Sequence, residues 1–449
     1  MAKRKVSKMD FNVIHPNAAS VDIGSRNHMA CVGLGDGETL EFGVFTEDHH
    51  AMAHWFVTNK CTTVAIESTG YYWQSLFLIL QSYDLEVILV NAKYAKNING
   101  QKTDVKDARW LWRLHTVGLL TNSFQPDAFT EELRTYNRQR KALIEDSSRY
   151  VSKMQKSLVL MNLQLPVVLS DITGKSGKSI ISAILAGERD GEALSKLAHP
   201  RVKASQETIA KALTGFWHPH HLFTLRQSWD MYQFYQQQIQ QCDQAIEVLL
   251  SAKIAQTGQN DLVYEARSKQ KQKNDPKFNV GKYIYQLSDG VDLLSIEGVG
   301  VNLVLSLISE VGLDLKSKFA SAKHFTSWLS LAPNNKISGG KVLSSKTKRN
   351  NNRLAHSFRQ AANAIGNMKG RTPLSREFAR IAYRSGRKTA IVAIARKLAT
   401  IVFCMLSRQE AYKPELAQQR QVEVRKIQIQ KLQNKVSKLG LKPEDLFFE

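Results

Sequence analysis

Four acidic residues near the N-terminal end of the chain have the types and spacing that phosphoryl-transfer chemistry uses. Asp22 lies within a short apolar run, Glu67 ends another, and Asp104 and Asp107 are three residues apart. On a helix this spacing puts both carboxylates on one face, and Thr103 is a suitable N-cap for that helix. Acids that converged at one place would repel one another and raise each other's pKa values.

A pair of Mg²⁺ ions would remove that repulsion. Two ions roughly 3.5–4 Å apart can clamp the attacking and leaving oxygens of a phosphoryl transfer. Mg²⁺ takes few carboxylates and keeps waters and phosphates as its other ligands. We therefore predict a magnesium site, with Mn²⁺ as a substitute, at Asp22, Glu67, Asp104 and Asp107 (the acidic quartet). The alternative is that each acid only ends a strand or caps a helix.

A second candidate, Ser338, stands before two glycines in a strongly basic stretch. From Leu315 to Arg376 there is no Asp or Glu, while thirteen Lys and Arg occur. A flexible, hydroxyl-bearing and cationic loop is a surface for a phosphodiester, and an activated serine can be a nucleophile. Taken without context, such a serine is an ordinary turn residue. The predicted nucleic-acid contacts in this stretch are Lys336, Lys341, Lys346, Lys348, Arg349 and Arg353.

The acidic quartet would be positioned by alternating strands and helices between Ala18 and about Gly118. The patterns predict strands at 20–25, 29–34, 40–45, 64–67 and 85–90, and helices at 50–59, 71–83 and 106–116. This order, in which three strands and a helix are followed by alternating strands and helices, is the order of an RNase H-like, RuvC-like α/β fold.

Two long amphipathic helices are predicted in the middle of the chain, over 133–160 and from 223 to about 252. They bracket an insertion and favour an antiparallel coiled coil. The insertion contains a Gly-Lys-Ser segment around Gly177, but Ile172 stands where a phosphate loop needs its first glycine. We expect a basic turn that opens a helix. Further on, Gly298 and Gly300 fit either a helix-hairpin-helix turn or a plain helix turn.

The composition favours a polyanionic partner. Among 449 residues, 62 Lys and Arg face 40 Asp and Glu, a formal charge of +22. Ribosomal and membrane-surface proteins share this trait. The scattered spacing of the four cysteines argues against disulfides and zinc sites and fits a reducing cytoplasm. We expect no signal peptide and no transmembrane helix, hence no membrane partner.

Several motifs together resemble one known family, the DEDD-type insertion-sequence transposases numbered one-ten, which are related to the Piv/MooV invertases and include RNA-guided bridge recombinases. The motifs are Val21-Asp22-Ile23-Gly24, Ile66-Glu67-Ser68-Thr69-Gly70, Lys102-Thr103-Asp104-Val105-Lys106-Asp107-Ala108, Glu297-Gly298-Val299-Gly300 and the block from Leu331 to Gly340. The resemblance covers nearly the whole chain, with residues 165–220 the least transferable part.

The resemblance implies a fold and a reaction. Residues 1–125 would be the RuvC-like catalytic domain that binds Mg²⁺, and 126–281 the coiled-coil and insertion region that dimerises and contacts nucleic acid. Residues 282–410 would be a mainly α-helical transposase domain, and 411–449 a basic helical tail. Ser338 would become covalently joined to DNA, and the RuvC-like site of one subunit would work with the serine domain of another.

The resemblance also implies partners. These are double-stranded DNA, both target and element ends, and a structured non-coding guide RNA encoded by the element. A homodimer, and a tetramer in the synapse, would act in the bacterial cytoplasm at the nucleoid. The leading hypothesis is therefore an RNA-guided transposase that excises and inserts a mobile element. The alternatives are a Holliday-junction resolvase that uses the same acids with water as nucleophile, and a non-catalytic nucleic-acid-binding protein.

Overall fold

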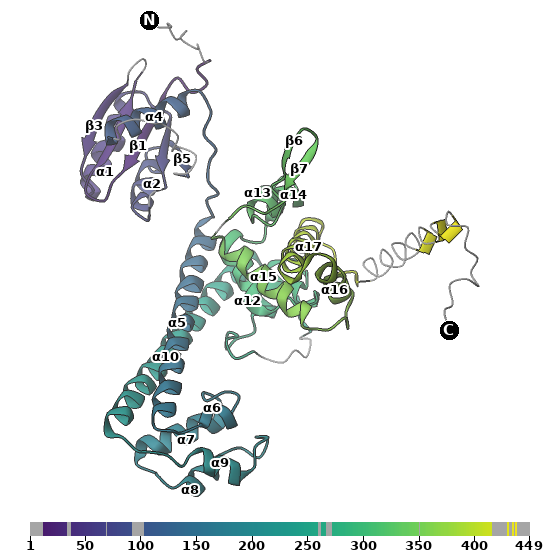
Figure 1. Cartoon of the computed structure of the whole chain (residues 1–449). Coiled ribbons are helices and arrows are strands. Elements are labelled where there is room, and N and C mark those ends of the chain that lie inside the picture. Colours follow the sequence, from purple (N-terminus) through teal and green to yellow (C-terminus); the bar gives the residue numbers. More distant parts are fainter. Residues whose placement is uncertain are drawn as a thin grey trace, which may run out of the picture. The chain divides into compact units, whose positions relative to one another are not determined.

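The structure is a computed structural model, and the chain forms two compact units, Met1–Gln125 and Pro126–Glu449 (Figure 1). It describes residues 12–33, 37–68, 70–91, 103–258, 262–265, 272–349, 351–414, 429–430, 433–434 and 436–437. Most of the predicted basic tail (411–449) and residues 1–11 lie outside the described residues. The predicted domain boundaries at 281 and 410 stay predictions.

The first unit is a mixed α/β unit built on a five-stranded sheet with the order β3-β2-β1-β4-β5. Its strands are β1 Ala18–Ile23, β2 His28–Val32, β3 Glu38–Phe42, β4 Thr63–Glu67 and β5 Glu86–Val90. The first three strands are antiparallel, whereas β4 is parallel to both β1 and β5. The predicted α/β order is confirmed, and the finer RNase H-like assignment stays a prediction.

Successive side chains of each strand point to opposite faces of the sheet. Val21 and Ile66 join a core with Met52 of α1 (Thr46–Thr58) and Leu76 of α2 (Trp73–Gln81). The other face, represented by Ala18, packs on α4 (Asp104–Thr116). The sheet is therefore covered by helices on both faces.

Helix α1 begins at Thr46, four residues earlier than the predicted start at about residue 50. The reason is a local cap, because the backbone N–H of Phe45 donates to the Asp48 carboxylate at 3.0 Å. Asp48 also places a negative charge in the first turn, where the helix dipole favours it. A prediction based on apolar periodicity does not register such a cap.

The second unit begins with two long antiparallel helices, α5 (Ala128–Leu160) and α10 (Pro219–Thr257) (Figure 1). Their antiparallel register follows from side-chain pairs along their length. The Ser157 hydroxyl hydrogen-bonds to the Thr224 hydroxyl, and the Tyr150 ring contacts the Tyr235 ring in a tilted arrangement. The predicted pair of long antiparallel helices is confirmed.

Four short helices form the insertion between α5 and α10. They are α6 Leu165–Val168, α7 Lys175–Ala186, α8 Gly191–Ser195 and α9 Gln206–Ala212. Helix α7 opens at the Gly-Lys-Ser segment, as predicted. A Cβ on Gly177 would lie only 2.1 Å from the Ile172 carbonyl oxygen, so this glycine is used for close packing.

The rest of the second unit is mainly helical, with one small hairpin. Its elements are α11 Val280–Leu287, η1 Leu293–Ser295, α12 Val301–Val311, α13 Leu315–Lys318, α14 Ala322–Trp328, β6 Lys336–Ser338, β7 Lys341–Ser344, α15 Arg353–Gly366, α16 Pro373–Ser385 and α17 Arg387–Arg408.

Helix α17 is the one helix of the described residues that is long and apolar enough to cross a membrane. This differs from the expectation that no segment would pass that test. Half of its apolar window is buried, and side chains such as Ile394, Leu398 and Phe403 lie in the core of the unit. The core helix of a soluble protein passes the same test of length and composition.

Candidate functional site

Asp22 and Glu67 lie at the carboxyl ends of neighbouring parallel strands. The register pairs Val21 of β1 with Ile66 of β4, so Asp22 and Glu67 are the next positions along the two strands. Neighbouring strands are about 4.8 Å apart, and the side chains of paired positions point to the same face. The sheet therefore brings these two acids side by side.

The face they share is the one that packs on α4. The hydroxyl of Ser20 donates to the Ala108 carbonyl oxygen at 2.7 Å, and the Trp112 indole donates to the Ala18 carbonyl oxygen at 3.0 Å. Helix α4 thus runs antiparallel to β1, because its later residues lie beside the beginning of the strand. The N-terminus of α4 lies at the end of the strand that carries Asp22.

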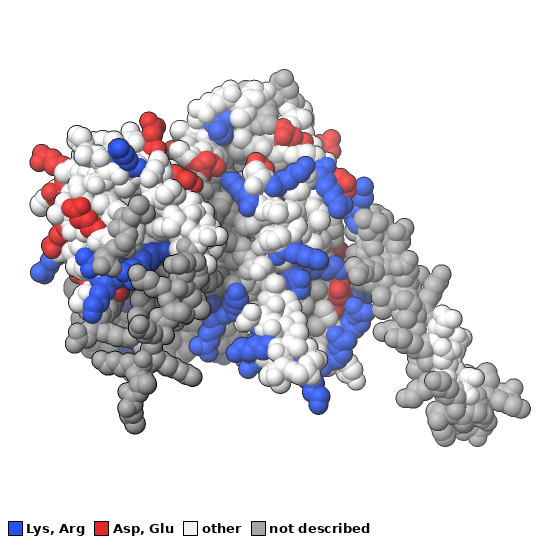
Figure 2. Space-filling view, turned by 90° about the horizontal axis from the view of Figure 1, so that it is seen from above, with Lys and Arg blue, Asp and Glu red and all other residues white. Residues whose placement is uncertain are grey.

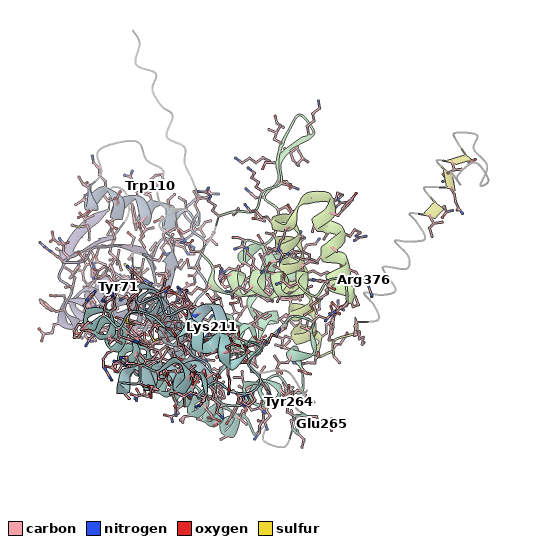
Figure 3. The ribbon with its side chains drawn as sticks, turned by 60° about the horizontal axis from the view of Figure 1, so that its bottom comes forward. Tyr71, Trp110, Lys211, Tyr264, Glu265 and Arg376 are labelled. Atoms are coloured by element: carbon pink, nitrogen blue, oxygen red, sulfur yellow. The ribbon has the colours of Figure 1, made fainter. Side chains whose placement is uncertain are left out.

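Asp104 and Asp107 are in the first turn of α4. The Lys106 backbone N–H donates to the Thr103 hydroxyl at 3.3 Å, which confirms the predicted N-cap. Asp104 is one turn before Ala108 and shares its sheet-facing side, whereas Trp110 lies on the opposite side of the helix (Figure 3). The helix dipole favours both carboxylates at this end.

The structure therefore brings the acidic quartet to one end of the first unit, but it does not gather the carboxylates into a ligand cluster. Among the described residues no group of three His, Cys, Asp or Glu is arranged to hold a metal ion. Asp104 is exposed, and the other three are half-buried. An all-carboxylate donor set fits Mg²⁺, which accepts oxygen ligands and few carboxylates at a time.

Ser338 lies at the end of β6, next to the turn of a two-stranded hairpin. The turn residues Gly339 and Gly340 have φ of +54° and +73°. Positive φ at both central residues is the type I′ geometry of tight hairpins and favours glycine. Ser338 pairs with Lys341 across this turn, and both residues are exposed. The serine predicted from the sequence is accessible, on a projecting hairpin of the second unit (Figure 1).

All six predicted nucleic-acid contacts of this region are exposed. They are Lys336, Lys341, Lys346, Lys348, Arg349 and Arg353. On the face shown in Figure 2, Lys and Arg side chains gather over the second unit with few acidic side chains among them. The field around the hairpin is therefore positive and would attract a polyanion.

A further cationic surface was missed by the sequence reasoning. Helix α16 exposes Arg376, Arg380 and Arg384 at four-residue spacing, with Tyr383 97% exposed between them. Its opposite side is buried through Leu374. Figure 3 shows Arg376 on this helix. The signal was present in the sequence as the i, i+4 repeat of arginines.

Two family models match separate segments of the chain. A model of DEDD-type IS110 transposases matches residues 19–162, which include the whole acidic quartet. A model described as the transposase IS116/IS110/IS902 family matches residues 292–379, which include Ser338. The chain belongs to the IS110 family of transposases.

As a transposase, the protein binds DNA and acts on it as an enzyme. Residues 163–291 lie outside both matches and contain the insertion helices α6 to α9 and the whole of α10. A comparison with curated proteins finds no match.

Proposed function

We propose that this transposase is an RNA-guided DNA recombinase that excises and inserts a mobile element through a covalent phosphoserine intermediate. The observation that carries the proposal is the exposed cationic hairpin at Ser338. A nuclease that used water as its nucleophile would need the acidic quartet but would have no use for an accessible hydroxyl among lysines. Both candidate sites lie within the matched transposase segments.

The acidic quartet would hold divalent metal, Mg²⁺ in the first place and Mn²⁺ as a substitute. Asp22 and Glu67 would contribute from the sheet, and Asp104 and Asp107 from the first turn of α4. Bound metal would neutralise charge on the scissile phosphate and polarise it for attack. Because β1, β4 and α4 approach the site from different directions, small movements of the half-buried Asp22, Glu67 and Asp107 side chains would complete the set of metal ligands.

Ser338 would act as the nucleophile. Its Oγ would form a bond to phosphorus while the bond from phosphorus to a deoxyribose oxygen breaks. The serine hydroxyl loses a proton and the departing oxygen gains one, so the step is balanced without ATP. The phosphoserine ester conserves the phosphodiester energy, and attack by another DNA end would reverse the step and join new strands.

Sequence specificity would come from an element-encoded guide RNA that pairs with target and donor DNA. A protein that holds two nucleic acids by their backbones needs a large positive charge, and the chain carries +22. The long α5–α10 pair would mediate dimerisation, and two dimers would form the tetrameric synapse. The quartet of one subunit would then serve the Ser338 of another.

The experiment that tests the chemistry is a denaturing gel for protein–DNA adducts. Purified protein with its co-purified RNA, Mg²⁺ and element-end DNA would be compared for wild type, Ser338→Ala and Asp104→Ala. Ser345→Ala is the matched control, because Ser345 is an exposed serine just beyond the same hairpin. We expect an adduct with wild type and Ser345→Ala, and none with the other two variants.

The rival function, a Holliday-junction resolvase, predicts a different gel. Water as the nucleophile would give cleaved DNA without an adduct, and Ser338→Ala would cleave as well as wild type. Ribonuclease treatment before the reaction tests the RNA guide separately. Unchanged adduct formation on the element-end DNA after RNA removal would contradict RNA guidance while leaving the serine chemistry in place.

A further inference from the structure

A groove of about 1610 Å³ opens in the second unit, and neither Ser338 nor any residue of the acidic quartet lines it. One wall is α5 around Lys141, another is the start of α12 around Asn302, and a third is the first half of α15 from Arg353 onward. The segment 272–280 closes a further side, and Tyr264, labelled in Figure 3, also lines it. Four segments that are distant in sequence thus form one cavity.

The side chain of Lys141 lines this groove, and its main polar contact there is with a hydroxyl group. Its Nζ donates to the Ser306 hydroxyl at 2.6 Å. Burial lowers the pKa of Lys141, Glu310 opposes that effect, and the positive charges of Arg353 and Arg138 lower the pKa further. Lys141 is therefore close enough to Arg353 and Arg138 for their positive charges to act on it.

The nearby carboxylates are already engaged by other arginines. Glu310 receives two hydrogen bonds from Arg138, at 3.0 and 2.7 Å. Asp243 pairs with Arg140 at 2.5 Å. In the described part of the chain, no carboxylate forms an ion pair with Lys141 or Arg353. Among the described lining residues six are Lys or Arg and two are Asp or Glu, so the groove carries an excess of positive charge.

The two carboxylates of the lining belong to Asp275 and Glu145. Asp275 accepts hydrogen bonds from the Asn302 amide at 2.8 Å and from the Gln272 backbone N–H at 2.8 Å. Glu145 is exposed and lies one helical turn after Lys141 on α5. Neither forms an ion pair with the cations at the centre of the groove.

The start of α12 adds donors to the same space. Its N-cap is Gly300, which has no side chain to satisfy the first backbone N–H groups of the helix. A Cβ at Gly300 would meet no atom within 4 Å, so the backbone there is open to the groove. Helix N-termini carry partial positive charge and free N–H groups that suit phosphate.

We propose that this groove binds the phosphodiester backbone of a nucleic-acid strand, with one phosphate held between Lys141 and Arg353. The proposal rests on the nucleic-acid binding of the transposase family and is independent of the serine chemistry. DNA and RNA share the phosphate chemistry that the groove recognises.

The path of the chain supports the same occupant. Strand β7 ends at Ser344 and α15 begins at Arg353, so these nine residues span at most about 30 Å. The connecting segment carries the exposed Lys346, Lys348 and Arg349. A strand bound near the hairpin would therefore meet a basic path that leads toward the groove.

The test measures binding of fluorescein-labelled 20-nucleotide single-stranded DNA, single-stranded RNA and duplex DNA to the full-length protein across a salt series. The variants are Lys141→Met and Arg353→Gln. We expect each to weaken binding of at least one probe by roughly 5–10-fold near 0.1 M salt. We also expect each to reduce the slope of log K against log salt by about one, the signature of one lost phosphate contact.

Two control variants accompany the test. Lys211→Gln removes an exposed lysine of α9 that already pairs with Glu207 at 2.7 Å, and should leave binding unchanged. Ser345→Ala should also bind like wild type. Because this assay measures binding and the adduct gel measures the serine chemistry, failure of the serine mechanism is distinguishable from failure of the groove. Arg353 is exposed, so its variant tests the groove even if Lys141→Met proves unstable.

The three probes separate the sources of the phosphate. Weaker binding of RNA alone would identify a guide-strand groove, and weaker binding of either DNA probe would identify a groove for target or element DNA. Wild-type affinity and an unchanged salt slope for Arg353→Gln with all three probes would overturn the proposal.

Discussion

The buried ion pair between Arg140 and Asp243 gives the sharpest prediction for stability. Arg140 of α5 and Asp243 of α10 are 2.5 Å apart (Nε to Oδ1), and their side chains are only 2% and 4% exposed. The pair is also tied to its surroundings, because Arg140 donates to the Asn274 carbonyl oxygen at 2.9 Å and the Lys277 N–H donates to Asp243 at 3.2 Å. Arg140→Met would leave Asp243 buried and without its cation.

Removal of one partner of a buried pair typically costs about 3–5 kcal/mol. At roughly 2 °C per kcal/mol for a unit of this size, the second unit of Arg140→Met should melt about 6–10 °C lower. An apolar pair of similar volume is often neutral or stabilising. The double variant Arg140→Met with Asp243→Leu should therefore recover most of the loss.

Thermal unfolding by circular dichroism measures the shift, and hydrogen exchange in α5 and α10 locates it. Arg149→Met is the matched control on the same helix, since its pair with Asp146 is 74% and 37% exposed at 3.0 Å. Exposed pairs of this kind contribute at most about 1 kcal/mol. A melting temperature of Arg140→Met within about 2 °C of wild type would refute the reasoning, as would a double variant no more stable than the single one.

Three further predictions concern backbone conformation and pH. Gly298→Ala should lower the free energy of unfolding of the second unit, measured by urea denaturation, by about 2 kcal/mol or more, because Gly298 has φ +72° and a Cβ would lie 2.5 Å from a side-chain atom of α15. Gly300→Ala should not. Gly339→Val should cut adduct yield severalfold because a β-branched residue resists φ +54°, and Gly339→Asn should retain it. Burial lowers the pKa of His28 from 6.5 to about 4. The unfolded chain protonates this histidine near pH 6.5, whereas the folded chain keeps it neutral down to about pH 4. The first unit should therefore lose stability as the pH falls from 6.5 to 4. Over that range its melting temperature should fall less in His28→Gln than in wild type.

The sequence could predict the strands that carry Asp22 and Glu67 and the helix that begins near Asp104. It could not predict the direction in which α4 crosses that sheet. That direction follows from two contacts, Ser20 with the Ala108 carbonyl and Trp112 with the Ala18 carbonyl. Both join residues about ninety positions apart, and neither leaves a periodic signal.

The long helices show a different limit. The amphipathic pattern predicted both long helices and, as part of a coiled coil, an apolar seam between them. The structure instead buries polar residues such as Asn137 and Arg140 there. A sequence pattern that places polar residues at the surface cannot predict a helix interface that is held by hydrogen bonds. For the same reason it cannot predict the groove at Lys141.

The hairpin that carries Ser338 is held by few contacts of its own. Its apolar side chains Ile337, Val342 and Leu343 are 63%, 59% and 70% exposed, although a two-stranded hairpin without a packed face is marginally stable in water. Its base is closed by the hydrogen bond from the Asn334 N–H to the Lys346 carbonyl oxygen, at 3.2 Å.

A nucleophile must be positioned within fractions of an ångström to react, and such a base alone cannot provide that precision. We therefore expect the hairpin to become rigid only when a nucleic acid or a second subunit covers its apolar face. Hydrogen exchange at Val342 should be fast in the free protein and slow in the DNA complex. Ser338 would then remain unreactive until the complex assembles, which would protect chromosomal DNA from cleavage by the unassembled protein.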